Sequence, residues 1–513
     1  MSHNILSLTV ISIQYDTLNI DQLIAPIIEN LSFKESVHTI PQLPIMNSAF
    51  TQNGAASLAS TLDARLNLFF KAVRGIEPEN LIPLVDASWN VSKLDTMKIL
   101  MNWRDCRGGK GDYSGFITAM AHIATTDPEW FHVNIENVPE YGRYLDLVKI
   151  WHLAPDTTKS KIMDHVVAQL VKDAELVKAG DGEGTSISLL AKWIPSEKKK
   201  WDNGFVNALC KALFNVTNVK STHIKNLRTS YLTPLRTRLK IVEQNMCSST
   251  YTFPYETVPS CAMQRYKKAF KKNDAERFEE YMKAVTQGTK KINADQVYPH
   301  DLVRQYMNAL EEDPVIEAQW KVICEKVSGS GAFDDSVVVC DVSGSMSGTP
   351  MEVAIALGLL SRNKLITFSE SPQLHDVPYQ CSFFTQVKNV MNMPWGYNTN
   401  LEKVMDLVAT LPQPIKRLYI FSDMQFDQAV SGSSKTHFQQ LKTKFKEVPQ
   451  IIFWNLNGNT ADFPTTGEDS NVMLLSGYSP ALLKMVTDAK EINPLSVLLT
   501  MLDSMRYERV KSP

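Results

Sequence analysis

Four consecutive apolar residues, Val337 to Cys340, lead directly into the polar loop Asp341-Val342-Ser343-Gly344-Ser345. The apolar residues are β-branched or small, which predicts a strand buried on both faces of a parallel sheet. Open parallel sheets bind their ligands beyond the carboxyl ends of strands, where Asp341 is the first polar residue. One carboxylate and two hydroxyls on alternate residues supply the oxygen ligands that magnesium prefers. The stretch therefore predicts a site for magnesium, or another divalent cation, at a strand end.

Apolar runs and helical patterns alternate along the rest of the C-terminal part, after a Ser/Gly-rich linker at 327–332. The predicted strands are Val337–Cys340, Leu365–Phe368, Leu418–Phe421, Ile451–Trp454 and Val472–Leu475, and the predicted helices are 350–361, 383–391, 400–410, 436–446 and 480–488. Alternation of this length implies a parallel sheet covered on both faces. We therefore expect a doubly wound α/β domain over residues 328–513.

The preceding residues, 61–327, carry helical periodicity almost throughout. Ser92-Lys93-Leu94-Asp95 is a capping-box pattern that opens one of these helices. Amphipathic helices joined by short polar loops predict a HEAT-like α-helical array, although the sequence has no repeat of fixed period. Residues 1–60 mix a short helical pattern with Pro and Gly breaks, and we expect them to form an N-terminal extension.

Length and composition agree with a multi-domain protein. The chain has 513 residues, of which 44% are hydrophobic and 21% charged, so we expect two or three domains of ordinary globular composition. The 7 cysteines are widely spaced and form no Cys-x-x-Cys pair, which argues against a disulfide framework and against a zinc site. No segment resembles a signal peptide or a membrane span. We therefore expect a reducing, cytoplasmic location without membrane contact.

Basic residues gather in one segment, although the whole chain has a net charge of only -2. Between Lys198 and Lys272 there are fifteen basic and three acidic residues, so this segment is strongly positive and the remainder is negative. Such an asymmetry points to a polyanionic partner, and the alternative is a solvated lysine face without a partner. The candidate nucleic-acid-binding residues are Arg236, Arg238, Lys240, Arg265, Lys267, Lys268, Lys271 and Lys272.

The glycine-rich loop at 104–112 is similar to a phosphate-binding loop in composition only. It lacks the Gly-x-x-x-x-Gly-Lys-Ser/Thr spacing, and it follows a helical segment instead of an apolar strand. We interpret it as a turn that ends a helix, with arginines that reach a neighbouring segment or a polyanion.

Two later loops complete the candidate metal site. Thr399 lies in the turn Trp395-Gly396-Tyr397-Asn398-Thr399-Asn400 before a predicted helix, and Asp423 directly follows a predicted strand. In a doubly wound sheet, neighbouring strand ends bring such loops to one edge. No general base or nucleophile lies near these residues in the sequence, which favours binding over catalysis. The alternative is a capping Ser/Asp turn that holds no metal.

This order of motifs resembles the metal-ion-dependent adhesion site of von Willebrand factor A domains, over about residues 335–510. The resemblance implies that magnesium is held, in part through water, by Asp341, Ser343, Ser345, Thr399 and Asp423. It also implies that an acidic side chain of a protein partner fills an open position on the metal. The chain departs from the common Thr-Asp-Gly at Ser422-Asp423-Met424, which puts the local turn in question.

Phrases of the N-terminal part are similar to motifs of a family of unknown function, in which a helical module precedes a von Willebrand A-like domain. The phrases are Leu100-Met101-Asn102-Trp103-Arg104-Asp105, Arg107-Gly108-Gly109-Lys110-Gly111, Tyr141-Gly142-Arg143-Tyr144-Leu145-Asp146-Leu147, Ala191-Lys192-Trp193-Ile194-Pro195-Ser196-Glu197 and Val258-Pro259-Ser260-Cys261-Ala262-Met263. The same order of parts resembles Ro (TROVE) proteins, whose helical-repeat ring binds RNA. That second resemblance lies in the architecture alone, so it transfers no RNA-binding residue.

The sequence therefore predicts a non-enzymatic binding protein. A basic helical domain would bind RNA in a Ro-like manner, and a magnesium-bearing domain would dock a protein partner. Two alternatives stay open: a structural or assembly protein that uses the metal site for protein contacts without RNA, and a magnesium-dependent phosphate hydrolase.

Overall fold

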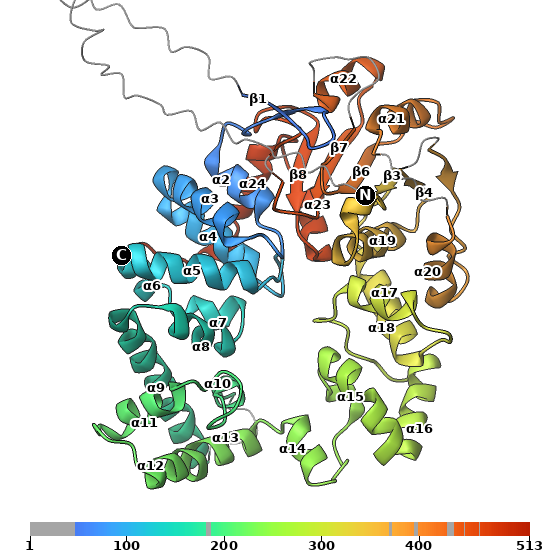
Figure 1. Ribbon diagram of the computed structural model, residues 1–513. Coiled ribbons are helices and arrows are strands. Elements are labelled where there is room, and N and C mark those ends of the chain that lie inside the picture. The colour runs from blue at the N-terminus through green and yellow to red at the C-terminus, as the bar shows by residue number, and fades with distance from the viewer. Residues whose placement is uncertain are drawn as a thin grey trace, which may run out of the picture. The chain divides into compact units, whose positions relative to one another are not determined.

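The computed structural model describes residues 47–180, 186–368, 372–393, 399–427, 436–445, 447–460 and 462–513. The chain divides into two compact units, 1–46 and 47–513. Only the second unit lies within the described residues. In Figure 1 the helical region, coloured blue to yellow, precedes the large sheet, which is built together with further helices from the yellow, orange and red C-terminal part.

The C-terminal part contains a 6-stranded sheet in the order β5-β4-β3-β6-β7-β8. Its strands are β3 Ser336–Cys340, β4 Leu365–Thr367, β5 Leu374–His375, β6 Arg417–Ser422, β7 Gln450–Asn455 and β8 Val472–Ser476. Neighbouring strands are parallel except for β4 and β5, which are antiparallel. Every residue of β3, β4 and β8 is buried, as apolar strands covered on both faces require. The predicted strands and the α/β class of this part are confirmed.

The strand order reverses beside β3. The chain adds β4 and β5 on one side of β3 and then returns to place β6 on its other side. Cys340 of β3 pairs with Phe421 of β6, so the two strands end at nearly the same level. Doubly wound sheets bind ligands at such a switch point, beyond the carboxyl ends of the strands. The residues that follow β3 and β6 therefore lie where the topology favours a binding site.

The α/β part also contains the predicted helices. They are α19 Thr349–Ser361, α20 Phe383–Met391, α21 Leu401–Ala409, α22 His437–Lys444 and α23 Leu483–Asp488, with α24 Pro494–Leu502 in addition and with short 3-10 turns η3 Gly344–Met346, η4 Pro480–Leu482 and η5 Met505–Tyr507. Helix α19 is buried on all sides from Glu352 to Ser361. It packs on β3 and β6 and also on the helices α17 Pro299–Met307 and α18 Pro314–Ser328, so it needs an apolar surface all round.

Helices follow one another from residue 64 to residue 328, which confirms the predicted helical region. Before α17 and α18 they are α2 Ala64–Lys71, α3 Pro78–Val91, α4 Lys93–Arg104, α5 Ser114–Thr126, α6 Pro128–Val133, α7 Asn137–Tyr141, α8 Tyr144–Leu153, α9 Asp156–Lys178, α10 Leu190–Trp193, α11 Phe205–Phe214, α12 Ser221–Asn226, η1 Leu227–Leu232, α13 Thr233–Arg238, α14 Val242–Cys247, η2 Tyr255–Thr257, α15 Ser260–Asn273 and α16 Ala275–Thr286. The Ser92 hydroxyl accepts the backbone N–H of Asp95 at 3.2 Å, so the predicted cap of α4 is present.

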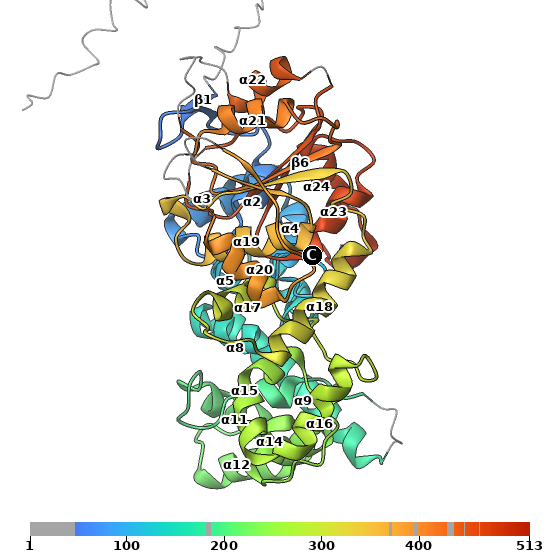
Figure 2. The same cartoon turned by 90° about the vertical axis from the view of Figure 1, so that its right-hand side faces the viewer.

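Both ends of the helical region pack on the α/β part. At the first end α2 contacts β8 and α24, and α4 contacts α24 and η5. At the last end α17 contacts α19 and α20, and α18 contacts the same two helices, which lie beside them in Figure 1 and Figure 2. The Tyr298 hydroxyl, just before α17, donates to the backbone oxygen of Gly111 at 2.7 Å, so the two ends of the helical region also meet each other.

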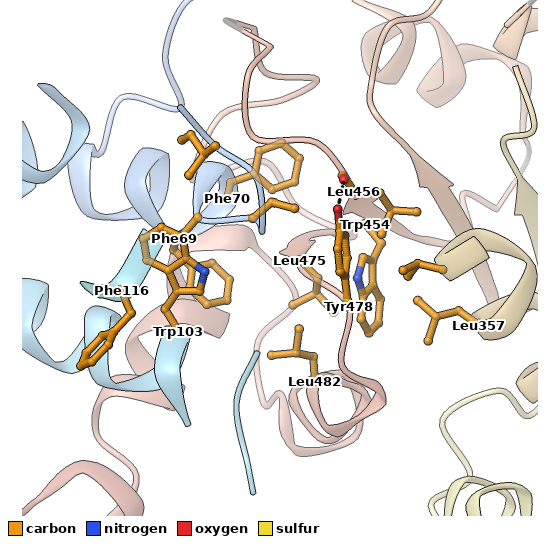
Figure 3. Packing of buried hydrophobic residues seen from close by; sticks show 14 of the residues in the cluster. Phe69, Phe70, Trp103, Phe116, Leu357, Trp454, Leu456, Leu475, Tyr478 and Leu482 are labelled. Atoms are coloured by element: carbon orange, nitrogen blue, oxygen red, sulfur yellow. Dashed lines mark hydrogen bonds between the residues drawn. The ribbon is translucent and has the colours of Figure 1, made fainter. Parts of the chain in front are cut away.

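One continuous apolar core joins the first helices to the sheet (Figure 3). Phe69 of α2, Trp103 of α4 and Trp454 of β7 are completely buried in it. Tyr478, which follows β8, donates its hydroxyl to the backbone oxygen of Leu456 at 3.2 Å within the same cluster. The helical region and the α/β part therefore share a core instead of being joined by a linker alone.

The loop at 104–112 is part of this junction. The Lys110 ammonium is buried and donates to the backbone oxygens of Phe69 and Ala72 and, at 2.6 Å, to the Ser476 hydroxyl. Burial lowers the pKa of Lys110 well below its usual value. Arg107 donates to the backbone oxygen of Glu140 at 2.5 Å, so it reaches a neighbouring segment. This geometry agrees with a turn that ends α4 and leaves no role for Lys110 in binding phosphate.

The last residues of the predicted extension belong to the α/β part. They form an antiparallel hairpin of β1 Ser48–Phe50 and β2 Ala56–Leu58. Gly54 forms a β-bridge with Asp427, and Leu58 forms one with Phe463. Most of the predicted extension, residues 1–46, lies outside the described residues.

Within the described ranges, no helix is both long and apolar enough to cross a membrane. The cysteines at 106, 210, 247, 261, 324, 340 and 381 are all free thiols, as their spacing predicts.

Candidate metal site and basic surface

Two carboxylates directly follow adjacent strands at the switch point of the sheet. Asp341 directly follows β3 and Asp423 directly follows β6, and their exposed fractions are 0% and 1%. The Ser422 hydroxyl donates to Asp341 Oδ2 at 2.6 Å, and the backbone N–H of Ser343 donates to Asp341 Oδ1 at 2.9 Å. The backbone N–H of Gln425 donates to Asp423 Oδ1 at 3.1 Å. The local turns therefore hold both carboxylates in place.

The two serines of the Asp-x-Ser-x-Ser loop connect these carboxylates. The hydroxyls of Ser343 and Ser345 lie 3.1 Å apart, and the Ser345 hydroxyl also interacts with the Asp423 carboxylate. Ser343 is buried, whereas Ser345 is exposed. Asp341, Ser343, Ser345 and Asp423, four of the five candidate ligands, thus form one connected group.

Thr399 lies at the side of this group. Its hydroxyl is 2.7 Å from the backbone oxygen of Gln425 and 3.1 Å from Asp427 Oδ1, and its backbone N–H donates to Asp427 Oδ2 at 2.8 Å. The Asn53 amide donates to the Thr399 hydroxyl at 3.3 Å and to the backbone oxygen of Gln425 at 2.8 Å. The contacts of Thr399 are therefore with the loop after Asp423 and with the hairpin, and residues 394–398 before it lie outside the described residues.

The electrostatics of the pair suit a cation. Burial and the neighbouring charge of Asp423 raise the pKa of Asp341 to about 6. Burial also raises the pKa of Asp423, and Asp462 adds to that effect. No lysine or arginine in the described part of the chain forms an ion pair with either carboxylate. Buried charge of this kind requires compensation, and carboxylates and hydroxyls are the ligand types that hard divalent cations accept.

The site contains residues that the sequence pattern did not single out. Gln425 and Asp427 hold Thr399, and Ser422 holds Asp341. Ser422 was named from the sequence only as part of the turn Ser422-Asp423-Met424, and no role in holding Asp341 was expected of it. Asn53 could not have been named from the sequence, because its contact depends on the hairpin packing more than 340 residues away in sequence. A cluster of at least 3 His, Cys, Asp or Glu side chains able to hold a metal does not occur among the described residues.

The eight candidate nucleic-acid-binding residues differ in their exposure and contacts. Lys240, Arg265, Lys268, Lys271 and Lys272 are exposed. Two others have internal roles, which corrects their assignment to a binding surface. Lys267 is buried, pairs with Asp313 at 2.7 Å and donates to Gln305 at 3.1 Å. Arg236 donates to the backbone oxygens of Ala191 and Ile194 at 2.9 Å each, at the end of α10.

Arg238 is partly exposed and also takes part in an interaction within the protein. The exposed members on α15 come from one helix whose buried side carries Met263, Lys267 and Phe270. The charged outer face that remains is therefore formed by Arg265, Lys268, Lys271 and Lys272.

The fold and the site define a two-part protein, in which a helical region packs at both ends on an open α/β sheet with paired carboxylates at its switch point. Family models match both parts: Domain of unknown function (DUF2828) matches residues 51–167 and 159–333, and Domain of unknown function (DUF7788) matches residues 335–506. The chain belongs to the DUF2828 family.

A relative and a solved structure resemble the chain along most of its length. Uncharacterized protein L728 of Acanthamoeba polyphaga mimivirus is 31% identical, over 89% of this chain and 87% of that protein. The crystal structure of the Deinococcus radiodurans RO (RSR) protein aligns with a TM-score of 0.44 and 14% identity, over 83% of this chain and 99% of that chain.

Proposed function

We propose that this protein is a non-enzymatic binding protein with two binding sites. In the proposal, residues 328–513 form a von Willebrand A-like domain that holds magnesium and docks an acidic side chain of a protein partner. The helical region binds RNA through its basic surface, in a Ro-like manner. The free thiols agree with the reducing, cytoplasmic location that we propose for it.

The proposed metal site depends on one observation, the buried pair of Asp341 and Asp423 at adjacent strand ends. Neither carboxylate forms an ion pair with a lysine or arginine among the described residues, and the buried Lys71 ammonium acts on Asp423 only as a nearby charge. Ser343 and Ser345 would join them as ligands, and Thr399 would act from the side of the pair. A bound divalent cation would offset the two negative charges and leave a position for an anionic ligand.

The metal proposal is tested by titrating Mg²⁺ or Mn²⁺ into the full chain in a calorimeter. We expect binding to the unaltered protein and no binding to Asp341→Ala or Asp423→Ala. Asp376→Ala is the matched control, because its side chain is 77% exposed and pairs only with Lys364 among the described residues. We expect a protein partner that docks through the metal to bind the Asp376→Ala variant and to fail to bind the Asp341→Ala variant. Lack of binding to the unaltered protein at millimolar metal would refute the site.

The RNA proposal depends on the exposed charges of α15. Arg265, Lys268, Lys271 and Lys272 lie on its outer face, and no carboxylate of the described residues forms an ion pair with them. Phosphate contacts of this kind make affinity fall steeply with salt concentration. Because Lys267 is buried, it does not belong to this surface.

Fluorescence anisotropy with a labelled RNA, at several salt concentrations, measures this. The triple variant Lys268→Glu, Lys271→Glu and Lys272→Glu is expected to weaken binding strongly and to reduce the salt dependence. A control with the same change of charge is Lys364→Glu, Lys416→Glu and Lys490→Glu on the α/β part, where the affinity is expected to stay nearly unchanged. Failure of the unaltered protein to bind RNA even at low salt would favour a structural or assembly role. Release of phosphate from a model phosphate ester would favour a hydrolase.

A further inference from the structure

Seven side chains near α8 and α10 alternate between cations and aromatic rings. In spatial order they are Lys192, Trp193, Arg143, Tyr113, Lys149, Trp201 and Lys200, and we name this set the cation–aromatic ladder. We propose that the ladder is a binding site for the unpaired bases and the phosphates of a single-stranded nucleic acid. The inference rests on the proposed RNA binding, and it adds the form of nucleic acid and the residues that contact it.

The distances define the order of the ladder. The Arg143 guanidinium lies 5.3 Å from the centre of the Trp193 ring and 5.6 Å from that of Tyr113. The Lys149 ammonium lies 4.0 Å from the centre of the Tyr113 ring and 4.7 Å from that of Trp201. Each of these two cations is therefore shared by two rings.

The two ends of the ladder carry one further lysine each. Lys192 lies 5.7 Å from the centre of the Trp193 ring, and Lys200 lies 5.3 Å from that of Trp201. Cation–π attraction holds each member to the next, which orders long side chains that would otherwise be mobile on a surface.

The ladder is assembled from separate elements. Tyr113 directly precedes α5, Arg143 directly precedes α8, and Lys149 lies within α8. Trp193 is the last residue of α10, and Trp201 lies in the loop between α10 and α11. Two of the phrases that carry the family resemblance, 141–147 and 191–197, thus meet in space at this place.

The loop that carries Trp201 has a strained backbone. Trp201 has a φ of 70°, and two other non-glycine residues of the loop, Lys198 and Asn203, also have positive φ. The Trp201 backbone oxygen lies 3.0 Å from His152 Nε2 of α8, and Asp202 accepts the backbone N–H groups of Lys198 and Val206. Such conformations cost free energy and persist where surrounding contacts impose them, often at binding sites.

Several groups of the ladder are left available to a ligand. Tyr113 is 41% exposed and Trp201 is 38% exposed, although both are large and partly apolar. Arg143 Nε is buried and has no hydrogen-bond partner among the described residues. Within that same part of the chain, Lys149 and Lys200 form no ion pair, and Arg143 approaches Asp146 only to 3.8 Å. Asp146 itself is held mainly by Arg104, at 2.7 Å.

The positive charges of the ladder repel one another. Burial lowers the pKa of Lys149, and the nearby charges of Arg143, Arg104 and Lys200 lower it further against the opposing effect of Asp146. A negatively charged ligand would relieve this repulsion.

The chemistry favours a single strand over other anionic ligands. Aromatic rings and a guanidinium plane stack on bases, and lysines between them contact phosphates, which is how single-stranded nucleic acids are bound with little sequence preference. An acidic peptide would use the lysines and leave the rings without a function. In a duplex the bases are stacked on each other and are not free to stack on the rings.

The test compares three labelled ligands by anisotropy: a uridine 20-mer, an abasic strand of equal length and charge, and an RNA duplex. We expect Trp201→Ala to weaken binding of the uridine strand about 10-fold, because one stacked base is lost, and to leave the abasic strand and the duplex nearly unchanged. Trp201→Phe should retain most of the affinity. Trp89→Ala is the matched control, since Trp89 also has a lysine over its ring, 5.8 Å away, at a different place.

If the alanine variant does not fold, Trp201→Phe and Lys200→Ala still test the site, because Lys200 is exposed. Lys200→Ala should then weaken the uridine strand and the abasic strand alike. Equal affinity of the unaltered protein for the uridine and abasic strands, or an unchanged uridine affinity in Trp201→Ala, would overturn the ladder while leaving RNA binding through α15 intact. If the unaltered protein binds polyglutamate and none of the three nucleic-acid ligands, both the ladder and the RNA surface on α15 are overturned. If the α15 charge reversals weaken RNA binding and the ladder variants do not, the RNA surface on α15 is correct and the ladder is not a binding site.

Discussion

The buried pair of Arg104 and Asp146 underlies the ladder, and its removal should have a large effect. The Arg104 and Asp146 side chains are 3% and 0% exposed, and Arg104 Nε lies 2.7 Å from Asp146 Oδ2. The same carboxylate accepts the backbone N–H of Arg143 at 2.9 Å and so caps the first turn of α8. Asp146→Asn keeps the shape of this side chain but leaves the guanidinium charge buried without a counter-ion.

Breaking a buried ion pair from one side costs about 3–5 kcal/mol, since one charge stays desolvated and unpaired. We expect the midpoint of urea unfolding, followed by tryptophan fluorescence, to fall accordingly in Asp146→Asn. Arg104→Met should cost a similar amount. The double variant should cost clearly less than the sum of both, because neither charge is then left alone.

Asp156→Asn is the control for this experiment. The Asp156 side chain is 98% exposed and lies 3.3 Å from Lys159, and exposed pairs of this kind contribute at most about 1 kcal/mol. A shift in Asp146→Asn no larger than in Asp156→Asn would refute the view that the buried pair carries this part of the fold. Additive effects of the two single variants would refute the coupling.

Three further outcomes are expected. Gly142→Ala should lower the Tm by several degrees, because the added Cβ would lie 2.9 Å from a backbone oxygen and closer still to the buried ion pair. Gly329→Ala should be tolerated, because the added Cβ would meet only ordinary contacts, the nearest at 3.5 Å. Burial lowers the pKa of Lys71 to about 8, so between pH 8 and 10.5 the unfolded protein binds more protons at this lysine than the folded protein does. The free energy of unfolding should therefore rise with pH in this range, by up to about 3 kcal/mol, and the Tm should rise with it. The variant Lys71→Met should lack this rise. Lys267→Ala should destabilise the protein by about 1–3 kcal/mol without changing RNA affinity, whereas Lys268→Ala should stay within about 0.5 kcal/mol of the unaltered protein.

Each of these outcomes can fail in a specific way. Equal Tm values for the two glycine variants would mean that the backbone at 142 adjusts freely. A parallel pH dependence of the unaltered protein and Lys71→Met would mean that this lysine stays charged when folded. Loss of RNA affinity in Lys267→Ala at unchanged stability would return that residue to the binding surface.

The basic residues illustrate why charge counting identified a segment but not a surface. Lys267 and Lys268 are neighbours in sequence, yet one is buried against Asp313 and the other is exposed. The helical period decides which of the two faces the core, but the partner of the buried lysine comes from a helix that begins more than 40 residues later. Arg236 is likewise occupied by backbone oxygens at the end of α10. A local sequence pattern contains no information about such partners.

The sequence alone determined the strand and helix order of the C-terminal part and the place of Asp341 and Asp423 at strand ends. Both follow from local rules, since burial on two faces requires continuous apolar runs and parallel strands end at one edge. Tertiary structure alone decided that Asn53 reaches Thr399, and that Tyr113, Arg143 and Trp201 gather in one ladder. These residues are far apart along the chain, and their contacts arise only when helices and loops pack around a shared core.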